Sequence, residues 1–269
     1  MPATRTLILT TLAVAPPAYY IYTTINRLEA SYPRLRPEAQ HSTAALRSPA
    51  FPVTDHTPHV DIYGARVPAK ALHGRHALDG RALSPEEAWA TLFLESPALR
   101  LEGKVLGSFA HGAGDAGERG FHPRQRLLNG LFEVVRPPSP SSSSSTASRF
   151  LRPIAALNQP QPLLVRWAFP PQAVGFFHKA AVDWGYPWRL MSGGRQEFAV
   201  GEPDGDGMVE VRYACAQDYE RVADEGHKQK TIPEWWLRLH RVYAMWLLDE
   251  RVEALKKRAA EEERREGGL

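Results

Sequence analysis

The sequence predicts an α+β fold in which a curved antiparallel sheet grips a long C-terminal helix, preceded by an N-terminal transmembrane helix. Residues 186–215 contain two alternating apolar runs around a turn of Gly, Pro and Asp, which is typical of a β-hairpin with one buried face. An aromatic, amphipathic pattern begins near residue 231, and an uncharged apolar segment opens the chain. A sheet with one apolar face needs a covering helix, so the hairpin and the helix predict a single domain.

The membrane anchor is expected at residues 1–26. Residues 7–25 carry no charge, and the segment is close to the ~20 residues that cross a bilayer as a helix. Tyr19, Tyr20 and Tyr22 lie at its far end, and aromatic side chains are enriched at membrane interfaces. A signal peptide that ends at the small-residue motif Ala-Val-Ala is the alternative.

The charges around this segment predict its orientation. Arg27, Arg34 and Arg36 follow it, against Arg5 before it, and cationic residues favour the cytosolic side of a membrane. The sequence has no Asn-x-Ser/Thr glycosylation site either. We therefore expect a single-pass membrane protein whose main domain is cytosolic.

The main domain is expected at residues 59–256. Residues 27–58 precede it, and their richness in Pro, Ser, Thr and Ala without a sustained period predicts a linker or an irregular cover. After a first strand, Ser84, Pro85 and Glu87 form a capping box with proline at the first helical position, so a helix begins there.

Further elements are expected between this helix and the hairpin. Residues 99–106 form a short strand or a helix, residues 128–135 and 163–169 form strands, and residues 172–184 form a helix with one apolar face. The Ser/Pro-rich tract at 137–148 is expected to be a disordered loop.

The C-terminal helix is expected to begin with Thr231 as its N-cap and Glu234 as the capping-box partner. Apolar and aromatic side chains recur at helical spacing from Ile232 to Leu255, which predicts that this face covers the sheet. Residues 257–269 are densely charged and are expected to form a solvated tail.

Composition and charge exclude several classes of function. The net charge is +3, and no basic stripe is interleaved with aromatic residues, so no nucleic-acid partner is expected. The only cysteine, Cys215, cannot form an internal disulfide. Because it lies on the inward face of the hairpin, we expect a small buried apolar side chain and not a nucleophile.

Three short motifs resemble known signatures but lack the structural context that those signatures need. Gly112, Gly114 and Gly117 match the spacing of a dinucleotide-binding loop, yet no parallel strand–helix–strand unit surrounds them. His73 and His76 lack the firm elements and further ligands of a zinc site. No serine lies in a nucleophile elbow. We therefore expect no metal and no cofactor.

Polar residues around the hairpin are better candidates for chemistry. If the sheet and the last helix bring them together, His178, Asp183 and His240 can act as a general acid–base set on an apolar substrate. The alternative for the neighbouring charged residues is cross-strand ion pairs on the solvent face, worth a few tenths of a kcal/mol: Arg189, Glu197 and Arg212.

Residues 59–256 resemble the START-like (helix-grip) domains of the polyketide-cyclase and lipid-transfer class, and among them a small family of unknown activity. The resemblance rests on LRLEG at 99–103, LFEVV at 131–135, SGGRQEFAV at 192–200 and the hairpin return that ends at Cys215. The helix at 172–184 and the Ser-rich loop depart from the family pattern.

The resemblance implies a cavity between the sheet and the last helix that holds a lipid, sterol, polyketide or other apolar molecule. Six side chains are expected to contact that molecule: Trp167, Arg189, Phe198, Tyr213, Trp235 and Leu239. Within such a fold three functions stay open, because fold does not decide function. The first is binding or transfer of an apolar small molecule at a membrane, the second is a cyclase, dehydratase or isomerase activity, and the third is a non-catalytic scaffold.

Overall fold

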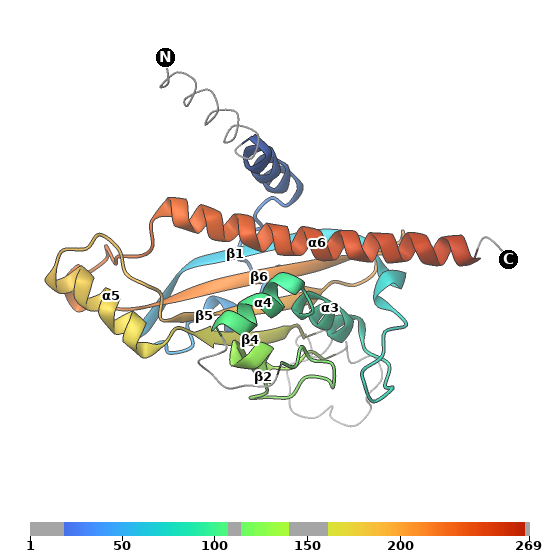
Figure 1. Cartoon of the computed structure of the whole chain (residues 1–269), viewed down its shortest axis with the longest axis horizontal. Helices are drawn as coiled ribbons and strands as arrows, with labels where there is room; N and C mark the ends of the chain where they lie inside the picture. The colour runs from blue at the N-terminus through green and yellow to red at the C-terminus, as the bar shows by residue number, and fades with distance from the viewer. Residues whose placement is uncertain (1–18, 107–113, 140–160, 267–269) are drawn as a thin grey trace, which may run out of the picture.

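The computed structural model describes residues 19–106, 114–139 and 161–266 (Figure 1). Its elements in chain order are a helix over residues 19–31, α2 (Ala44–Arg47), β1 (Asp55–Pro68), η1 (Ala69–Leu72), α3 (Pro85–Leu94), α4 (Pro97–Leu106), β2 (Arg126–Leu127), η3 (Leu128–Gly130), β3 (Phe132–Arg136), β4 (Leu163–Ala168), α5 (Pro171–Asp183), β5 (Gly193–Val200), β6 (Met208–Glu220), η5 (Ala223–Glu225) and α6 (Glu234–Glu266).

Several predicted features lie outside the described residues. They are most of the proposed membrane anchor, the first glycine of the Gly-x-Gly motif, and most of the Ser/Pro-rich loop. In the part of the chain that the structure describes, no helix combines the length and the apolar character that a bilayer crossing needs.

A six-stranded antiparallel sheet forms the centre of the fold, in the order β1-β6-β5-β4-β3-β2. The predicted hairpin is β5 and β6, in which Phe198 lies opposite Tyr213. β1 pairs with the other side of β6, with an irregular register between His56 and His59. The α+β class, the curved antiparallel sheet and the long C-terminal helix are therefore confirmed.

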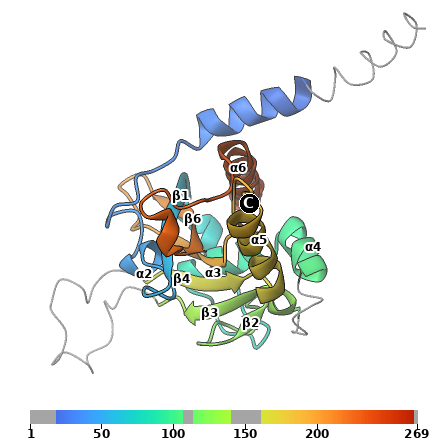
Figure 2. The same ribbon diagram turned by 90° about the vertical axis from the view of Figure 1, so that its left-hand side faces the viewer.

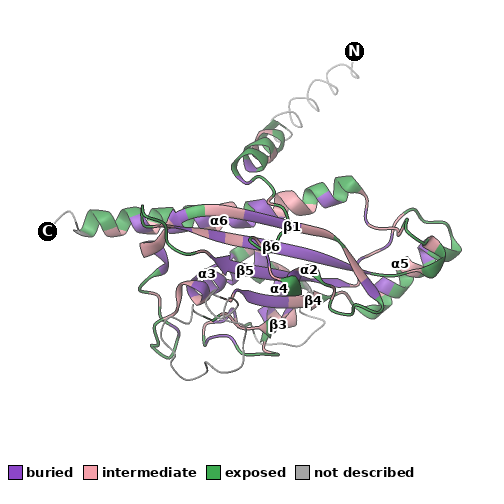
Figure 3. Ribbon diagram, turned by 180° about the vertical axis from the view of Figure 1, so that it is seen from behind, coloured by how far each residue is buried: buried purple, intermediate pink, exposed green. Residues whose placement is uncertain are grey.

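The two faces of the sheet are covered by different parts of the chain (Figure 2). On one face α3 packs over β5 and α6 packs over β1, while α2 packs on the opposite side against β5 and β6. As a result β5 is buried along its whole length (Figure 3). Residues 27–58, predicted to be a linker or an irregular cover, contain the end of the first helix, α2 and the start of β1, which begins at Asp55.

Aromatic rings fill the core between the sheet and α3. Phe93 stacks on Tyr213 with ring centroids 4.5 Å apart and approaches Phe198 at 5.1 Å. Trp89 Nε1 donates a hydrogen bond to the Arg212 carbonyl oxygen at 3.0 Å. Burial of each ring contributes about 1.5–3 kcal/mol, so α3 is fixed to the hairpin by packing and by a hydrogen bond.

The predicted helix starts were right at α3 and wrong at α6. Ser84 Oγ accepts a hydrogen bond from the Glu87 backbone N–H at 3.2 Å, and Glu87 Oε2 accepts one from the Ser84 N–H at 3.0 Å. At α6, Thr231 does not cap the helix, which begins at Glu234. The carbonyl of Pro233 accepts the first helical hydrogen bonds instead.

One other prediction was wrong, and one that left two alternatives open is now decided. Residues 128–135 are not one strand, because Leu128 and Asn129 have positive φ angles of 50° and 58° and form a turn before β3. Residues 99–106, predicted as a strand or a helix, belong to α4.

The charged C-terminal run continues α6 and does not form a separate tail. Ala259 is 3 % exposed. Arg258 Nη2 donates to the His73 carbonyl at 3.0 Å, and Lys70 Nζ lies 2.7 Å from Glu263 Oε1. The helix therefore packs on η1 beyond the point where its large apolar side chains end.

Candidate functional site

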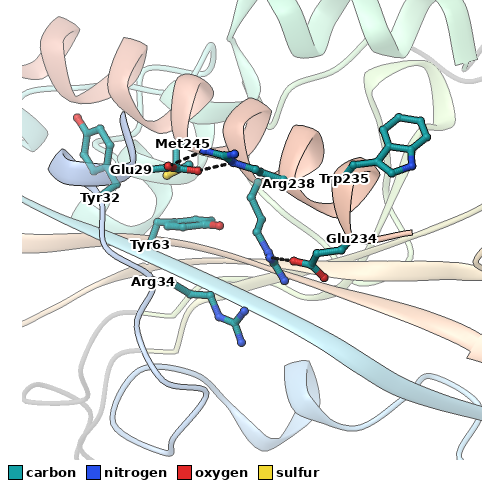
Figure 4. A pocket seen from close by; sticks show the side chains of 9 residues that line it. Glu29, Tyr32, Arg34, Tyr63, Glu234, Trp235, Arg238 and Met245 are labelled. Carbon is teal, nitrogen blue, oxygen red and sulfur yellow. Dashed lines mark hydrogen bonds and ion pairs between the residues drawn. The ribbon is translucent and has the colours of Figure 1, made fainter. Parts of the chain in front are cut away.

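A pocket of about 550 Å³ lies between the helix at 19–31, β1 and α6 (Figure 4). Its wall combines aromatic and apolar side chains with three arginines and two glutamates. The lining residues are Glu29, Tyr32, Arg34, Tyr63, Glu234, Trp235, Arg238, Arg241 and Met245.

Two ion pairs hold the pocket's rim together. Arg238 Nε lies 2.9 Å from Glu29 Oε1, which ties α6 to the N-terminal helix. Arg241 Nη1 lies 2.6 Å from Glu234 Oε1, about two helical turns back along α6. Because these charges neutralise each other, neither pair gives the pocket a net charge.

Arg34 is the exception among the pocket's arginines. Its only ion pair among the described residues is a 3.4 Å contact from Nη1 to Asp61 Oδ1, and its side chain is 49 % exposed. Most of its guanidinium donors therefore remain available to a carboxylate or phosphate, which a planar guanidinium binds with two parallel hydrogen bonds.

Asp61 and Cys215, which are buried, and the half-buried His240 form a polar cluster behind the pocket. A carboxylate oxygen, the thiol sulfur and a ring nitrogen all lie within 4.8 Å of one another. Asp61 and Cys215 are directly opposed on β1 and β6, and His240 comes from α6, which packs over β1. Asp61 Oδ1 accepts from Arg241 Nε at 3.2 Å. Because Arg241 also lines the pocket, the cluster and the pocket share a wall.

Burial sets the protonation of this cluster. It lowers the pKa of His240, and the Asp61 carboxylate opposes that shift. Burial also raises the pKa of the Cys215 thiol well above its ordinary value. Near pH 7 the imidazole is therefore a neutral acceptor, and the thiol is not a nucleophile in this environment.

Two further polar side chains border the cluster. Gln217 Nε2 lies 3.4 Å from His240 Nδ1, and Gln217 Oε1 is buried without a partner among the described residues. His59 lies opposite Gln217 in the strand register, and its Nε2 is also without a partner in this part of the chain. The sequence contains all of these residues, but only the β1–β6 register places them side by side.

The predicted acid–base residues are distributed over two helices. His178 on α5 lies 3.7 Å from Glu220, and Asp183 is exposed at the end of the same helix. His240 is the one member that lies beside the pocket and next to a carboxylate, that of Asp61.

The predicted ligand-binding residues are also divided. Trp235 lines the pocket, and Leu239 is exposed on α6. Phe198 and Tyr213 belong to the aromatic core beneath α3. Arg189 is buried and lies 2.9 Å from Glu225, where it holds the loop after β6.

Trp167 packs against the hairpin at its glycine pair. A Cβ on Gly194 would lie 2.8 Å from the Trp167 ring and 2.2 Å from the Ala216 carbonyl oxygen. Gly193, predicted as part of a bend, is equally tight, with a Cβ position 2.4 Å from the Trp167 carbonyl oxygen. The pair therefore allows the ring and both neighbouring strands to approach the backbone closely.

The charged residues predicted on a solvent face are covered. Glu197 is 2 % exposed, accepts from the Thr43 N–H at 3.2 Å and lies 3.5 Å from Arg136. Arg212 donates to the Gln40 carbonyl. Burial raises the pKa of Glu197. The prediction was wrong because the segment that contains α2 lies on this face of the sheet.

Comparisons with known proteins add no relative: no family model, curated protein or solved structure matches this chain. The functional argument therefore rests on the residues described above.

Proposed function

We propose that this protein is a membrane-associated, START-like binding protein for an amphipathic small molecule with an apolar body and an acidic head. The observation that carries the proposal is the pocket between the N-terminal helix, β1 and α6, with Trp235 on its wall and Arg34 beside it. A polyketide acid, a fatty acid or a similar lipid has the required shape and charge.

The wall of the pocket suits an apolar body. Tyr32, Tyr63 and Met245 are nearly buried, whereas Trp235 is 61 % exposed. A ligand that covers the indole removes apolar area from water, which is worth about 25 cal/mol per Å². The pocket differs from the cavity that the family resemblance implies, because α3 fills the centre of the sheet and the pocket lies at its β1 edge.

Exposed aromatic side chains support a membrane location. Tyr19, Tyr20 and Tyr22 on the N-terminal helix and Trp235 and Trp236 on α6 are all at least 50 % exposed. The Arg238–Glu29 ion pair joins these two helices. Tyrosine and tryptophan favour the membrane interface, so we propose that the mouth of the pocket faces the cytosolic surface of a bilayer.

Binding of matched probes tests the proposal. The full chain in mild detergent is titrated with a fluorescent hexadecanoic acid and with the corresponding alcohol. Arg34→Gln should weaken the acid about tenfold, because a hydrogen bond to a charged group is worth ~1.5–3 kcal/mol, and should leave the alcohol unchanged. Trp235→Ala should weaken both about fivefold through lost apolar contact.

Two matched variants control for general effects. Trp184→Ala removes a similarly exposed tryptophan directly after α5, and Arg100→Gln removes a half-exposed arginine from α4. Both should bind the probes like the unaltered chain. Equal losses in the controls, or no binding of either probe by the unaltered chain, would refute the proposed pocket.

One observation favours a second candidate function. The neutral imidazole of His240 lies beside both the pocket and Asp61, which suits a general base in a cyclase, dehydratase or isomerase. This alternative predicts that His240→Gln keeps probe affinity while it abolishes the change in product profile that the unaltered chain causes in an expressing host. Identical profiles with and without the substitution would exclude it.

A further inference from the structure

We propose that Asp61, Cys215 and His240 bind a zinc ion between the β1–β6 strand pair and α6. The site lies behind a wall that it shares with the ligand pocket, and it does not depend on the proposed function. Zinc is the ion that this set of donors fits, since cysteine sulfur, imidazole nitrogen and carboxylate oxygen are its usual protein ligands. Calcium and magnesium instead prefer all-oxygen sites.

The spacing of the three donors suits a single ion. With bonds of about 2.0–2.3 Å, the donors of a tetrahedral zinc site lie roughly 3.3–3.8 Å apart. The three atoms here lie within 4.8 Å of one another. Closing that difference requires the donor atoms to shift by about 1 Å on binding.

The Asp61 carboxylate keeps an oxygen for the ion. Arg34 Nη1 and Arg241 Nε both reach Oδ1, at 3.4 and 3.2 Å. Neither distance is as short as the ~2.7–2.9 Å of a strong charge-assisted hydrogen bond. Oδ2 can therefore bind the ion while the arginines orient the carboxylate, as outer partners of metal ligands do.

Gln217 provides the independent observation that points to a ligand. Its side chain is 1 % exposed, its amide lies 3.4 Å from His240 Nδ1, and its Oε1 has no partner among the described residues. Turning the amide places Oε1 at Nδ1, where it accepts the Nδ1 proton. That orientation satisfies the orphaned oxygen and leaves Nε2 of His240 with the lone pair that coordinates a metal.

We place His59 next to the fourth coordination position. Its ring nitrogens lie outside the three-donor set, so coordination by His59 requires a change of its rotamer. Its buried Nε2 is without a partner in the described part of the chain, and it lies two residues before Asp61, on the same strand face. Replacing His59 should therefore weaken zinc binding, whereas loss of Cys215 or His240 should remove it.

Metal content and cobalt spectroscopy test the site. The full chain, purified in detergent, is stripped with a chelator, loaded with zinc and dialysed. We expect about one zinc per chain, falling at least tenfold in Cys215→Ser and His240→Gln and less steeply in His59→Gln. His178→Gln on α5 is the matched control and should retain the metal. Circular dichroism of each variant checks that it is folded.

Cobalt substitution tests the site in the unaltered chain, so the result does not depend on whether a variant folds. Cobalt bound to the unaltered chain should show a sulfur-to-cobalt charge-transfer band, which only Cys215 can produce because it is the sole cysteine. A cobalt spectrum without that band, or zinc retained in Cys215→Ser, would show an adventitious ion only. Either result would overturn the proposal, and so would the absence of bound zinc after dialysis.

Discussion

Arg27 and Asp249 form a two-pronged ion pair that joins the N-terminal helix to α6. Nη1 lies 3.1 Å from Oδ1 and Nη2 lies 2.7 Å from Oδ2. The Tyr32 hydroxyl donates to the same carboxylate at 2.9 Å, and the hydrogen bond from Arg27 lowers the pKa of Asp249. This contact fixes the position of the helix that forms one wall of the proposed ligand pocket.

Replacing Asp249 tests this attachment. Asp249→Asn should increase amide hydrogen exchange in residues 19–31 several-fold, because the two-pronged ion pair becomes a single hydrogen bond from the guanidinium to a neutral amide oxygen. The global free energy of unfolding should fall by only about 0.2–1 kcal/mol, since Arg27 is largely exposed. Glu262→Gln, which alters a pair with Arg258 further along α6, is the control. Unchanged exchange in Asp249→Asn would contradict the attachment.

The free energy of unfolding should depend far more strongly on the Arg195–Asp218 pair, which lies on the covered face of the sheet. Both side chains are less than 5 % exposed, and Arg195 Nη2 lies 2.5 Å from Asp218 Oδ1. Arg195→Met should cost about 3–5 kcal/mol in urea unfolding, because the carboxylate is left buried without its partner. Arg66→Met at the exposed pair with Asp204 should change stability far less, because water solvates both charges whether or not they are paired. Similar losses at the two sites would show that the cover does not exclude water.

Substitutions in the aromatic core test whether its rings only pack or also contact the ligand. Phe93→Ala should destabilise the fold by about 3–5 kcal/mol, whereas Phe176→Ala on the exposed face of α5 should change stability by less than about 0.5 kcal/mol. Phe198→Leu should lower stability and leave the affinity for the hexadecanoic acid probe unchanged. Weaker probe binding by folded Phe198→Leu would place the ligand in the core, as the family resemblance implies.

Glu102 gives the fold a dependence on pH. It accepts a hydrogen bond from the Tyr243 hydroxyl at 2.8 Å, which links α4 to α6. Burial raises the pKa of Glu102, and the hydrogen bond opposes that shift. The folded state therefore holds this proton more tightly than the unfolded chain does. The resulting stability is fully present below about pH 4.5 and is lost as the pH rises through the folded-state pKa.

Glu102→Gln should remove that loss, because a neutral amide oxygen still accepts the Tyr243 hydrogen bond. The variant should be more stable than the unaltered chain at pH 7.5, and the difference should shrink towards pH 4.5, as measured by urea unfolding. Glu253→Gln, at an exposed pair with Lys256, should show no such trend. A variant that is less stable than the unaltered chain at pH 7.5 would show that the ionised Glu102 stabilises the fold, contrary to the prediction.

Local patterns in the sequence were enough to predict the elements that depend on neighbouring residues. The Ser84–Glu87 capping box and the β5–β6 hairpin were predicted because each depends on a few adjacent positions. The capping role of Thr231 failed although the motif is similar, because the Pro233 carbonyl starts α6.

The site could not be predicted in the same way, because it depends on pairing between distant segments. Asp61 and Cys215 meet only through the register of β1 on β6, and no local period encodes that register. The covered face was missed for a related reason. The segment before β1 has no regular pattern, yet it buries Glu197 through Thr43.

β1 is a long strand at the edge of the sheet, and the way it is shielded bears on self-association. An unpaired edge can template addition of a strand from another molecule. Here the Leu35 N–H donates to the Ile62 carbonyl at 2.9 Å, so the segment before β1 occupies one position of that edge. Pro58 and Pro68 lack N–H donors, and the register is interrupted before His59. These features should hinder strand addition by another molecule, and loss of the segment around Leu35 should make the edge more prone to aggregation.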